Sequence, residues 1–281
     1  MFRQSPKTLQ IEVTRRCNLN CNICMRSNLN HDEKELGIDD FKEIIKSGSF
    51  KWVGLHGWGE PLLNPSIFKM IEYAESIGIK TNITTNGTLV GNNIDRILSS
   101  GLKDIAFGIY DEERISSILP IVKNLIVERY RRGFETPRVY IDITIYSGNF
   151  RQIVSFLEKI SDAKPDAVIL HRIFNIHKVD KSIKYITGKQ ERQLFSIIKK
   201  VARIRRLKIF FPPKHSIPCK VVKQSVFVTI DKMVTPCCFL PELSLGDVIE
   251  KGVQKIIGSN KYAEFLKTMK EHPICSKCIS W

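Results

Sequence analysis

The sequence predicts an α/β protein built on a parallel sheet covered by helices, with a small α+β region near its C-terminal end. Over about 165 residues, six short and mostly continuous apolar runs alternate with segments of helical spacing. Beyond residue 174 this alternation stops. Six such units form either an open partial barrel or a doubly wound sheet, and in both folds ligands bind at the C-terminal ends of the strands.

The elements follow from apolar spacing and from residues that start or stop helices. Strands are expected at residues 9–13, 52–61 (strand and loop), 79–87, 102–110, 138–146 and 166–174. Helices are expected between them at residues 38–48, 64–78, 92–101, 116–132 and 149–162. Asp39 or Asp40 is expected as the N-cap of the first helix, and Pro65 stands in the first turn of the second.

A small C-terminal domain is expected to begin near residue 212. We therefore divide the chain into residues 1–211, the helix-covered sheet, and residues 212–281. Residues 190–206 predict a basic amphipathic helix that joins the two. In the small domain, the pattern predicts a hairpin that turns at Asp231 and Lys232, and a helix over residues 253–270.

Composition restricts the class of protein. The chain has 281 residues, of which 43% are apolar, which is enough for a large core. No run of about 20 apolar residues is present and the N-terminus lacks the apolar stretch of a signal peptide, so we expect a cytoplasmic protein without a transmembrane segment. Thiols stay reduced in that compartment, so the eight cysteines indicate metal or redox chemistry before disulfides.

The net charge of +15 is concentrated in one segment. Between residues 178 and 223, 14 Lys or Arg residues stand against two acidic residues, a net charge of +12. An anionic partner would explain this excess: a nucleic acid, a phosphorylated small molecule or a membrane surface. A solvated cationic face would explain it equally well. On an ideal helix Lys199, Arg203 and Arg206 share one face, where they could recognise an anion.

Three cysteines, Cys17, Cys21 and Cys24, fall within eight residues in the stretch TRRCNLNCNICMR. Three thiolates on a [4Fe–4S] cluster leave one iron free to bind a substrate or cofactor. A Cys-x3-Cys-x2-Cys loop after the first strand of a βα series resembles the radical S-adenosylmethionine (SAM) superfamily. The resemblance covers about residues 8–175 and implies a partial (β/α)6 TIM-like barrel in which SAM chelates the open iron. A zinc knuckle with a distant fourth ligand is the alternative.

Two further motifs resemble those of that superfamily and stand in register with the cysteines. The segment HGWGEP after the second strand resembles its Gly-Gly-Glu motif, which implies that Gly57, Gly59 and Glu60 bind the amino group of SAM. The segment TTNG after the third strand implies that Thr85 and Asn86 hydrogen-bond to SAM. Simple turns are the structural alternative for both segments.

The fourth strand departs from the pattern of the superfamily. Its end reads FGIYD, with Gly108 in place of the serine of a Ser-x-Asp segment, so Tyr110 or Asp111 is expected to compensate. Polar residues on the fifth and sixth strands are further candidates for contact with SAM or substrate, although a structural role would account for each of them as well. These residues are Asp142, Thr144, His171 and Arg172, of which we assign Thr144 to the cofactor.

Five cysteines remain in the C-terminal region: Cys219, Cys237, Cys238, Cys275 and Cys278. One cysteine, a hairpin bearing the next, a helix and a final Cys-x2-Cys together resemble the shortened SPASM domain called twitch. This resemblance implies one auxiliary [4Fe–4S] cluster, held by all of these cysteines except Cys238. A structural zinc site would use the same four thiols.

Together the resemblances imply a radical SAM oxidoreductase or maturase-type enzyme with SAM and two [4Fe–4S] clusters as cofactors. They imply reductive cleavage of SAM to a 5′-deoxyadenosyl radical, which takes hydrogen from an unidentified and, given the basic segment, anionic substrate. The auxiliary cluster would assist electron transfer, and Cys238 and Tyr110 are candidate catalytic residues. We expect a monomer reduced by a partner such as ferredoxin or flavodoxin. The alternative is a non-catalytic Fe–S or zinc module that binds nucleic acid.

Overall fold

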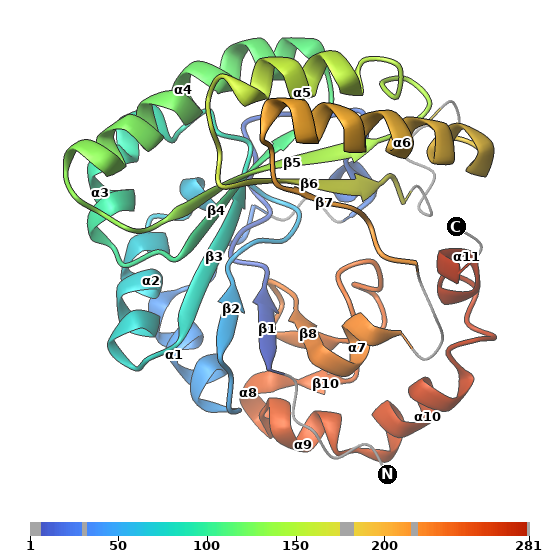
Figure 1. The fold of residues 1–281 in the computed structure, drawn as a ribbon. Coiled ribbons are helices and arrows are strands. Elements are labelled where there is room, and N and C mark those ends of the chain that lie inside the picture. The colour runs from blue at the N-terminus through green and yellow to red at the C-terminus, as the bar shows by residue number, and fades with distance from the viewer. Residues whose placement is uncertain (1–6, 30–32, 175–182, 215–218, 280–281) are drawn as a thin grey trace. The chain divides into compact units, whose positions relative to one another are not determined.

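The computed structural model describes residues 7–29, 33–174, 183–214 and 219–279 (Figure 1). The chain forms two compact units. The first unit consists of Met1–Leu19, Leu29–Ile83 and Lys214–Trp281. The second consists of Asn20–Asn28 and Thr84–Pro213. The first unit therefore combines the beginning of the chain with its last 68 residues.

A mixed sheet organises the first unit, with its strands in the order β10-β9-β8-β1-β2-β3. β1 pairs in parallel with β2 on one side and with β8 on the other, so that Thr8 lies opposite both Trp52 and Ser225. The pairs β8–β9 and β9–β10 are antiparallel. The strand bounds are β1 (Thr8–Ile11), β2 (Trp52–Gly54), β3 (Lys80–Thr85), β8 (Ser225–Val228), β9 (Met233–Thr235) and β10 (Gly246–Asp247).

The helices expected at residues 38–48, 64–78 and 253–270 are present with corrections to their ends, and short helices at residues 220–224, 248–251 and 275–279 were not expected. Pro65 precedes the second helix instead of lying in its first turn, because Ser66 is the N-cap. The bounds of the helices in the first unit are α1 (Ile38–Lys46), α2 (Ile67–Ser76), α7 (Lys220–Gln224), α8 (Val248–Lys251), α9 (Val253–Ile257), α10 (Asn260–Thr268) and α11 (Cys275–Ile279), with a 3-10 turn, η2 (Pro61–Leu63). The N-cap of α1 is Gly37, so Asp39 and Asp40 lie in its first turn instead. The single helix expected over residues 253–270 is two helices, because Ser259 starts α10 by accepting a hydrogen bond from the Tyr262 amide.

The second unit is a parallel sheet with helices between its strands. Its strands follow the order β4-β5-β6-β7, and each neighbouring pair is parallel. Figure 1 shows α4, α5 and α6 lying along one side of this sheet. The bounds are η1 (Met25–Asn28), η3 (Gly91–Asn93), α3 (Ile94–Ser99), β4 (Asp104–Ile109), α4 (Glu112–Arg131), β5 (Arg138–Ile145), α5 (Ile153–Ser161), β6 (Ala167–Arg172), α6 (Gly188–Arg205) and β7 (Ile209–Phe210).

Burial along the strands shows which side chains face the core. In β5 every second residue is fully buried, from Val139 to Ile145, while Asp142 and Thr144 lie half-buried on the other face. Helix α4 begins four residues before the expected start at 116, because the Asp111 carboxylate accepts a hydrogen bond from the Arg114 amide and caps it. The predicted α/β class with parallel strands is confirmed in both units.

Candidate active site

The chain segment that leads to the first cysteine is buried and fixed by its neighbours. Because Ile11 lies opposite Val228, the residues that follow the two parallel strands come together. The main-chain amide of Glu12 donates to the Val228 carbonyl at 2.9 Å. Glu12 is fully buried and Arg15 is 8% exposed. The approach to Cys17 therefore runs through the interior of the first unit, next to the C-terminal hairpin.

The loop at residues 56–61 packs directly against this segment. A β-carbon on Gly57 would lie 2.8 Å from the Glu12 β-carbon, and one on Gly59 would lie 2.2 Å from the Thr14 carbonyl oxygen. The amide of Glu60 donates to the Arg16 carbonyl at 2.8 Å, and its carboxylate accepts from the Leu62 amide at 3.1 Å. Only glycine permits this approach, so the loop and the segment before Cys17 form one packed element.

Cys21 and Cys24 belong to the second unit and lie on one tight turn. The Cys24 amide donates to the Cys21 carbonyl at 3.0 Å. The Tyr110 hydroxyl hydrogen-bonds to the Cys21 thiol, and burial together with this bond raises the pKa of Tyr110. A hydrogen bond to a cysteine sulfur changes the reduction potential of the cluster that this sulfur binds. Tyr110 would therefore act on the first cluster through the predicted ligand Cys21.

Thr85 and Asn86 use their side chains to shape the turn after β3. The Gly87 amide donates to Thr85 Oγ1 at 3.0 Å, and both the amide and the hydroxyl of Thr88 donate to Asn86 Oδ1, at 3.0 and 2.7 Å. Arg114 donates to the main-chain carbonyl of Asn86. Both side chains therefore hold the turn at the end of the strand, as the turn alternative anticipated.

Asn149 is a residue of this region that the sequence analysis missed. Its side-chain amide donates to the carbonyls of Tyr110 and Thr144, each at 2.8 Å, and it is 1% exposed. It therefore joins the end of β4 to the end of β5, on which the assigned cofactor residue Thr144 lies. An asparagine in the run SGNF looks like an ordinary turn residue, and nothing in the sequence indicates its partners.

The candidates on β6 already have protein partners. His171 Nε2 lies 3.2 Å from Asp142 Oδ1. Burial acts against the charged imidazole, but the Asp142 carboxylate outweighs it and raises the pKa of His171 above 6.5. Arg172 forms a two-pronged ion pair with Glu191 of α6, at 2.6 and 3.1 Å. Arg172 therefore fastens the basic helix to the sheet.

All eight cysteines are free thiols. Those of the C-terminal region influence one another. Burial, and then the charges of Cys238, Cys275 and Cys219, raise the pKa of Cys237, and burial with Cys219 and Cys275 raises that of Cys278 to about 11. Within the part of the chain that the structure describes, no three His, Cys, Asp or Glu side chains form a ready group for a metal ion. Thiolates are the soft ligands that iron–sulfur clusters take, so these cysteines suit such a cluster by their chemistry.

Cys238 has a different environment from the other C-terminal cysteines. Burial, with a smaller contribution from the Glu12 carboxylate, raises the pKa of its thiol to about 12. Next to it, Phe239 packs edge-to-face on Trp58 with ring centroids 5.7 Å apart. The loop after β9 therefore contacts the 56–61 loop, which packs on the approach to Cys17, and its Cys238 lies within electrostatic reach of Glu12.

Two regions of the sequence match models of known protein families. Residues 11–186 match the radical SAM superfamily, and residues 219–279 match SPASM, an iron–sulfur cluster-binding domain. The chain belongs to the radical SAM superfamily. A radical SAM domain binds SAM and a [4Fe–4S] cluster, and a SPASM domain binds further iron–sulfur clusters. Membership in a family of enzymes overturns the alternative of a non-catalytic nucleic-acid-binding module.

Several relatives of this radical SAM chain are known. The tungsten-containing aldehyde ferredoxin oxidoreductase cofactor-modifying protein of Pyrococcus furiosus is 22% identical over 317 residues, covering 97% of this chain and 87% of that protein. A probable GTP 3′,8-cyclase of Methanothermobacter marburgensis is 31% identical over 132 residues, which cover 46% of this chain and only 43% of that relative.

Solved structures show the same fold. SuiB of Streptococcus suis bound to the precursor peptide SuiA has a TM-score of 0.71 at 16% identity, covering 98% of this chain and 67% of SuiB. The enzyme anSMEcpe with bound AdoMet has a TM-score of 0.70 at 17% identity, covering 92% of this chain and 83% of that structure. These likenesses agree with a parallel sheet of the partial-barrel type in the radical SAM domain and a cluster-binding domain at the C-terminal end.

The basic segment of the radical SAM chain lies partly outside the described residues, which omit 175–182 and 215–218. In helix α6, Lys199 and Arg203 are exposed as expected. Arg206 does not share their face, because it terminates the helix in a left-handed conformation with φ of 55°. Arg205 lies 3.6 Å from Glu158 of α5. No described helix is long and apolar enough to cross a membrane.

Proposed function

We propose that this chain cleaves SAM reductively at a [4Fe–4S] cluster held by Cys17, Cys21 and Cys24, and that an auxiliary cluster assists electron transfer with the substrate. One observation carries the proposal furthest. The glycine loop that resembles the SAM-binding motif packs on the main chain just before Cys17 and donates a hydrogen bond to Arg16. This is the arrangement that a cluster loop and a SAM loop need if they are to serve one cofactor.

When bound, the cluster and SAM supply a 5′-deoxyadenosyl radical that abstracts a hydrogen atom from the substrate. The residues of the chain hold and orient these groups. Gly57 and Gly59 bring main-chain groups close to the ligand, and Glu60 caps η2 and so fixes the loop against Arg16. Thr85, Asn86 and Thr144 line the strand ends of the second unit as further contacts for SAM.

Cys219, Cys237, Cys275 and Cys278 are proposed to hold the auxiliary [4Fe–4S] cluster, and Cys238 to remain a protonated thiol. The SPASM match over residues 219–279 supports an auxiliary cluster in this region, and the deeper burial of Cys238 supports leaving it out of the ligand set. In this proposal residues 212–281 form the auxiliary-cluster domain and residues 1–211 the radical SAM domain.

For the substrate we propose an anionic small molecule of the cofactor-precursor kind. The concentration of positive charge between residues 178 and 223 supports an anion. The relative that aligns over nearly the whole chain carries the name of a cofactor-modifying protein. A reduced ferredoxin or flavodoxin is the proposed electron donor, and a monomer the proposed state.

The central experiment measures iron and SAM cleavage in the anaerobic protein. Two clusters predict about 8 Fe and 8 sulfide per chain, and addition of dithionite and SAM should release 5′-deoxyadenosine. Changing Cys17, Cys21 and Cys24 together to Ala should leave about half of the iron and no cleavage. Zinc in place of the remaining iron would refute the auxiliary cluster.

The substrate class is tested by transfer of deuterium from labelled candidates into 5′-deoxyadenosine. Phosphorylated cofactor precursors, nucleotides and peptides form the test set. For a compound that transfers deuterium, replacing Lys199, Lys200 and Arg203 by Gln should raise KM most at low salt, since screening acts beyond about 8 Å at physiological ionic strength. A matched control replaces the exposed residues Lys251, Lys255 and Lys261 by Gln. Equal effects of the two triple variants would remove the support for anion recognition by α6.

A further inference from the structure

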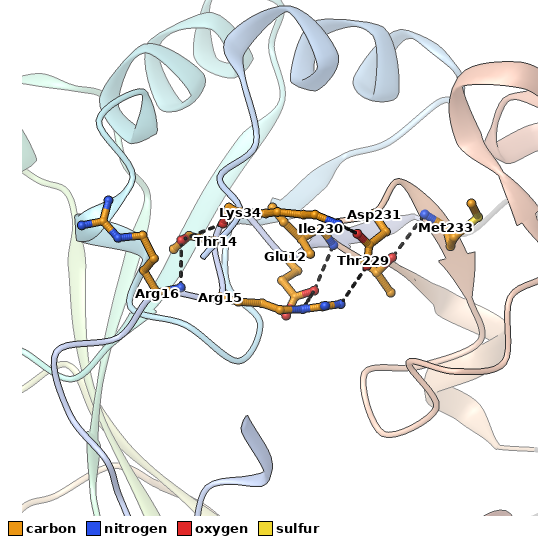
Figure 2. Close-up of polar contacts among 9 residues, drawn as sticks. All are labelled: Glu12, Thr14, Arg15, Arg16, Lys34, Thr229, Ile230, Asp231 and Met233. Atoms are coloured by element: carbon orange, nitrogen blue, oxygen red, sulfur yellow. Dashed lines mark hydrogen bonds and ion pairs between the residues drawn. The ribbon is translucent and has the colours of Figure 1, made fainter. Parts of the chain in front are cut away.

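A network of charged residues ties the approach to Cys17 to the β8–β9 hairpin (Figure 2). The Glu12 carboxylate accepts, on one oxygen, the Ile230 amide at 2.9 Å and Arg15 Nε at 3.3 Å. Arg15 Nη2 lies 3.2 Å from Asp231 Oδ2. Lys34 Nζ donates to Asp231 Oδ1 at 2.8 Å. Arg15 thus bridges two carboxylates, one from the segment before Cys17 and one from the hairpin.

The network contains a buried charge that the fold does not fully compensate. Glu12 is fully buried, and its second oxygen, Oε1, has no hydrogen-bond partner among the residues described. Burial raises the pKa of Glu12 despite the Ile230 amide and Arg15. Removing a carboxylate from water without full pairing costs stability. A role other than stability therefore accounts best for a glutamate at this position.

The position of the network in the sequence indicates that role. Arg15 stands two residues before Cys17, and Asp231 stands six residues before Cys237. Thr14 adds a second fastening, because its hydroxyl donates to the Lys34 carbonyl at 3.2 Å and accepts the Arg16 amide at 3.0 Å. The Lys34 residue that holds Thr14 through its main chain also holds Asp231 through its side chain.

We propose that Glu12, Arg15 and Asp231 are positioning residues that lock the entrance of the first cysteine loop onto the β8–β9 hairpin, so that the Cys17 ligand and the chain leading to Cys237 move as one element. The inference rests on the proposed assignment of these cysteines as cluster ligands. In this arrangement a displacement of the auxiliary-cluster hairpin changes the geometry of the SAM-binding cluster.

The test combines hydrogen exchange of the full-length, metal-free protein with EPR of the cluster-loaded protein. Asp231→Asn keeps the shape of the side chain and removes its charge at a site where the Asp231 side chain is 38% exposed. We expect amides of residues 12–16 to exchange about tenfold faster. The hydrogen-bonded charge of Asp231 stabilises the closed state of this segment, so its loss makes local opening easier. We also expect the EPR change on addition of SAM to be smaller. Asp231→Glu should restore both.

A matched control separates this coupling from general fastening of the hairpin. Asp40→Asn makes the same chemical change at the Lys232–Asp40 pair, 3.4 Å apart, which ties the same hairpin to α1 instead. It should leave exchange at residues 12–16 and the EPR response unchanged. Equal effects of the two Asn variants, or faster exchange with a normal EPR response, would overturn the proposal.

Arg15→Lys provides a second variant, because a lysine cannot bridge both carboxylates as the guanidinium does. It should reproduce the faster exchange, and wild-type exchange in this variant would also refute the bridge. Exchange in the metal-free protein is independent of cluster and SAM. A wild-type chain without SAM cleavage would therefore refute the proposed function and leave the exchange result standing.

Discussion

Gly59 lies so close to Thr14 that a β-carbon at residue 59 would stand 2.2 Å from the Thr14 carbonyl oxygen. The Arg16 carbonyl oxygen would be 2.7 Å from the same carbon. Because both obstacles are main chain, Gly59→Ala must displace the segment that leads to Cys17. We expect a loss of about 1–3 kcal/mol in unfolding free energy, together with loss of SAM cleavage, measured by thermal unfolding and by release of 5′-deoxyadenosine.

Gly91→Ala is the control for this substitution. A β-carbon on Gly91 would meet no atom within 4 Å. Its stability and SAM cleavage should equal those of the wild type. Full SAM cleavage by Gly59→Ala would show that the close packing of the 56–61 loop is not required for the site.

Variants in the two cysteine sets should affect cleavage of SAM and turnover of substrate differently. Cys17→Ala should abolish SAM cleavage, because the SAM-binding iron loses a ligand. Cys275→Ala should retain uncoupled cleavage and lose turnover, while Cys238→Ala should keep the full iron content. Iron analysis and 5′-deoxyadenosine release measure these outcomes, and full turnover by Cys275→Ala would argue against a function for the auxiliary cluster.

Tyr110→Phe should shift the potential of the SAM-binding cluster. The Tyr110 hydroxyl hydrogen-bonds to Cys21, and such bonds favour the reduced, more negative cluster. Removal of the bond should therefore lower the reduction potential. The shift is roughly 20–60 mV if the free energy of the hydrogen bond differs by about 0.5–1.4 kcal/mol between the reduced and the oxidised cluster. An EPR-monitored redox titration measures the shift. Tyr146→Phe is the control, since burial and Asp111 account for the raised pKa of Tyr146, and an equal shift in both variants would contradict the assignment.

His171 should titrate above its usual pKa as long as Asp142 is ionised. With a folded-state pKa raised above 6.5, this pair contributes stability that is fully present below pH 6.5 and is lost as the pH rises through the folded-state value. Asp142→Asn removes the carboxylate that raises the pKa of His171, whose side chain is 53% exposed, so this pKa should fall toward 6.5. NMR titration of the imidazole measures this directly. His272, whose pKa burial lowers, is an internal control. An unchanged His171 titration in Asp142→Asn would disprove the pairing.

The strands and the first-cluster motifs could be predicted because their signals are local. An apolar run, a glycine pair and a cysteine spacing each lie within about ten residues. Caps were harder to predict. Gly37 starts α1 without a side-chain hydrogen bond, so the nearby Asp39 and Asp40 were the more plausible caps by composition. Arg206 looked like a continuation of α6, and only the left-handed backbone there removes it from the basic face.

The polar framework of the site could not be predicted, because its partners are far apart in the sequence. The carboxylate of Glu12 binds the amide of Ile230, 218 residues away. In the sequence, Glu12 is a single charged residue at the end of an apolar strand, a position that usually indicates exposure. Asn149 and Tyr110, 39 residues apart, are joined only because β4 and β5 end side by side.

The pairing of β1 with β8 has a consequence for how the protein is made. Thr8 emerges from the ribosome 217 residues before its partner Ser225. At about 5–20 residues per second, β1 therefore waits roughly 10–40 s with one edge unpaired. An open edge of this kind is a template for association with other chains. Slow synthesis in the middle of the message should therefore raise the yield of aggregated protein, and an early supply of the β8–β9 segment in trans should lower it.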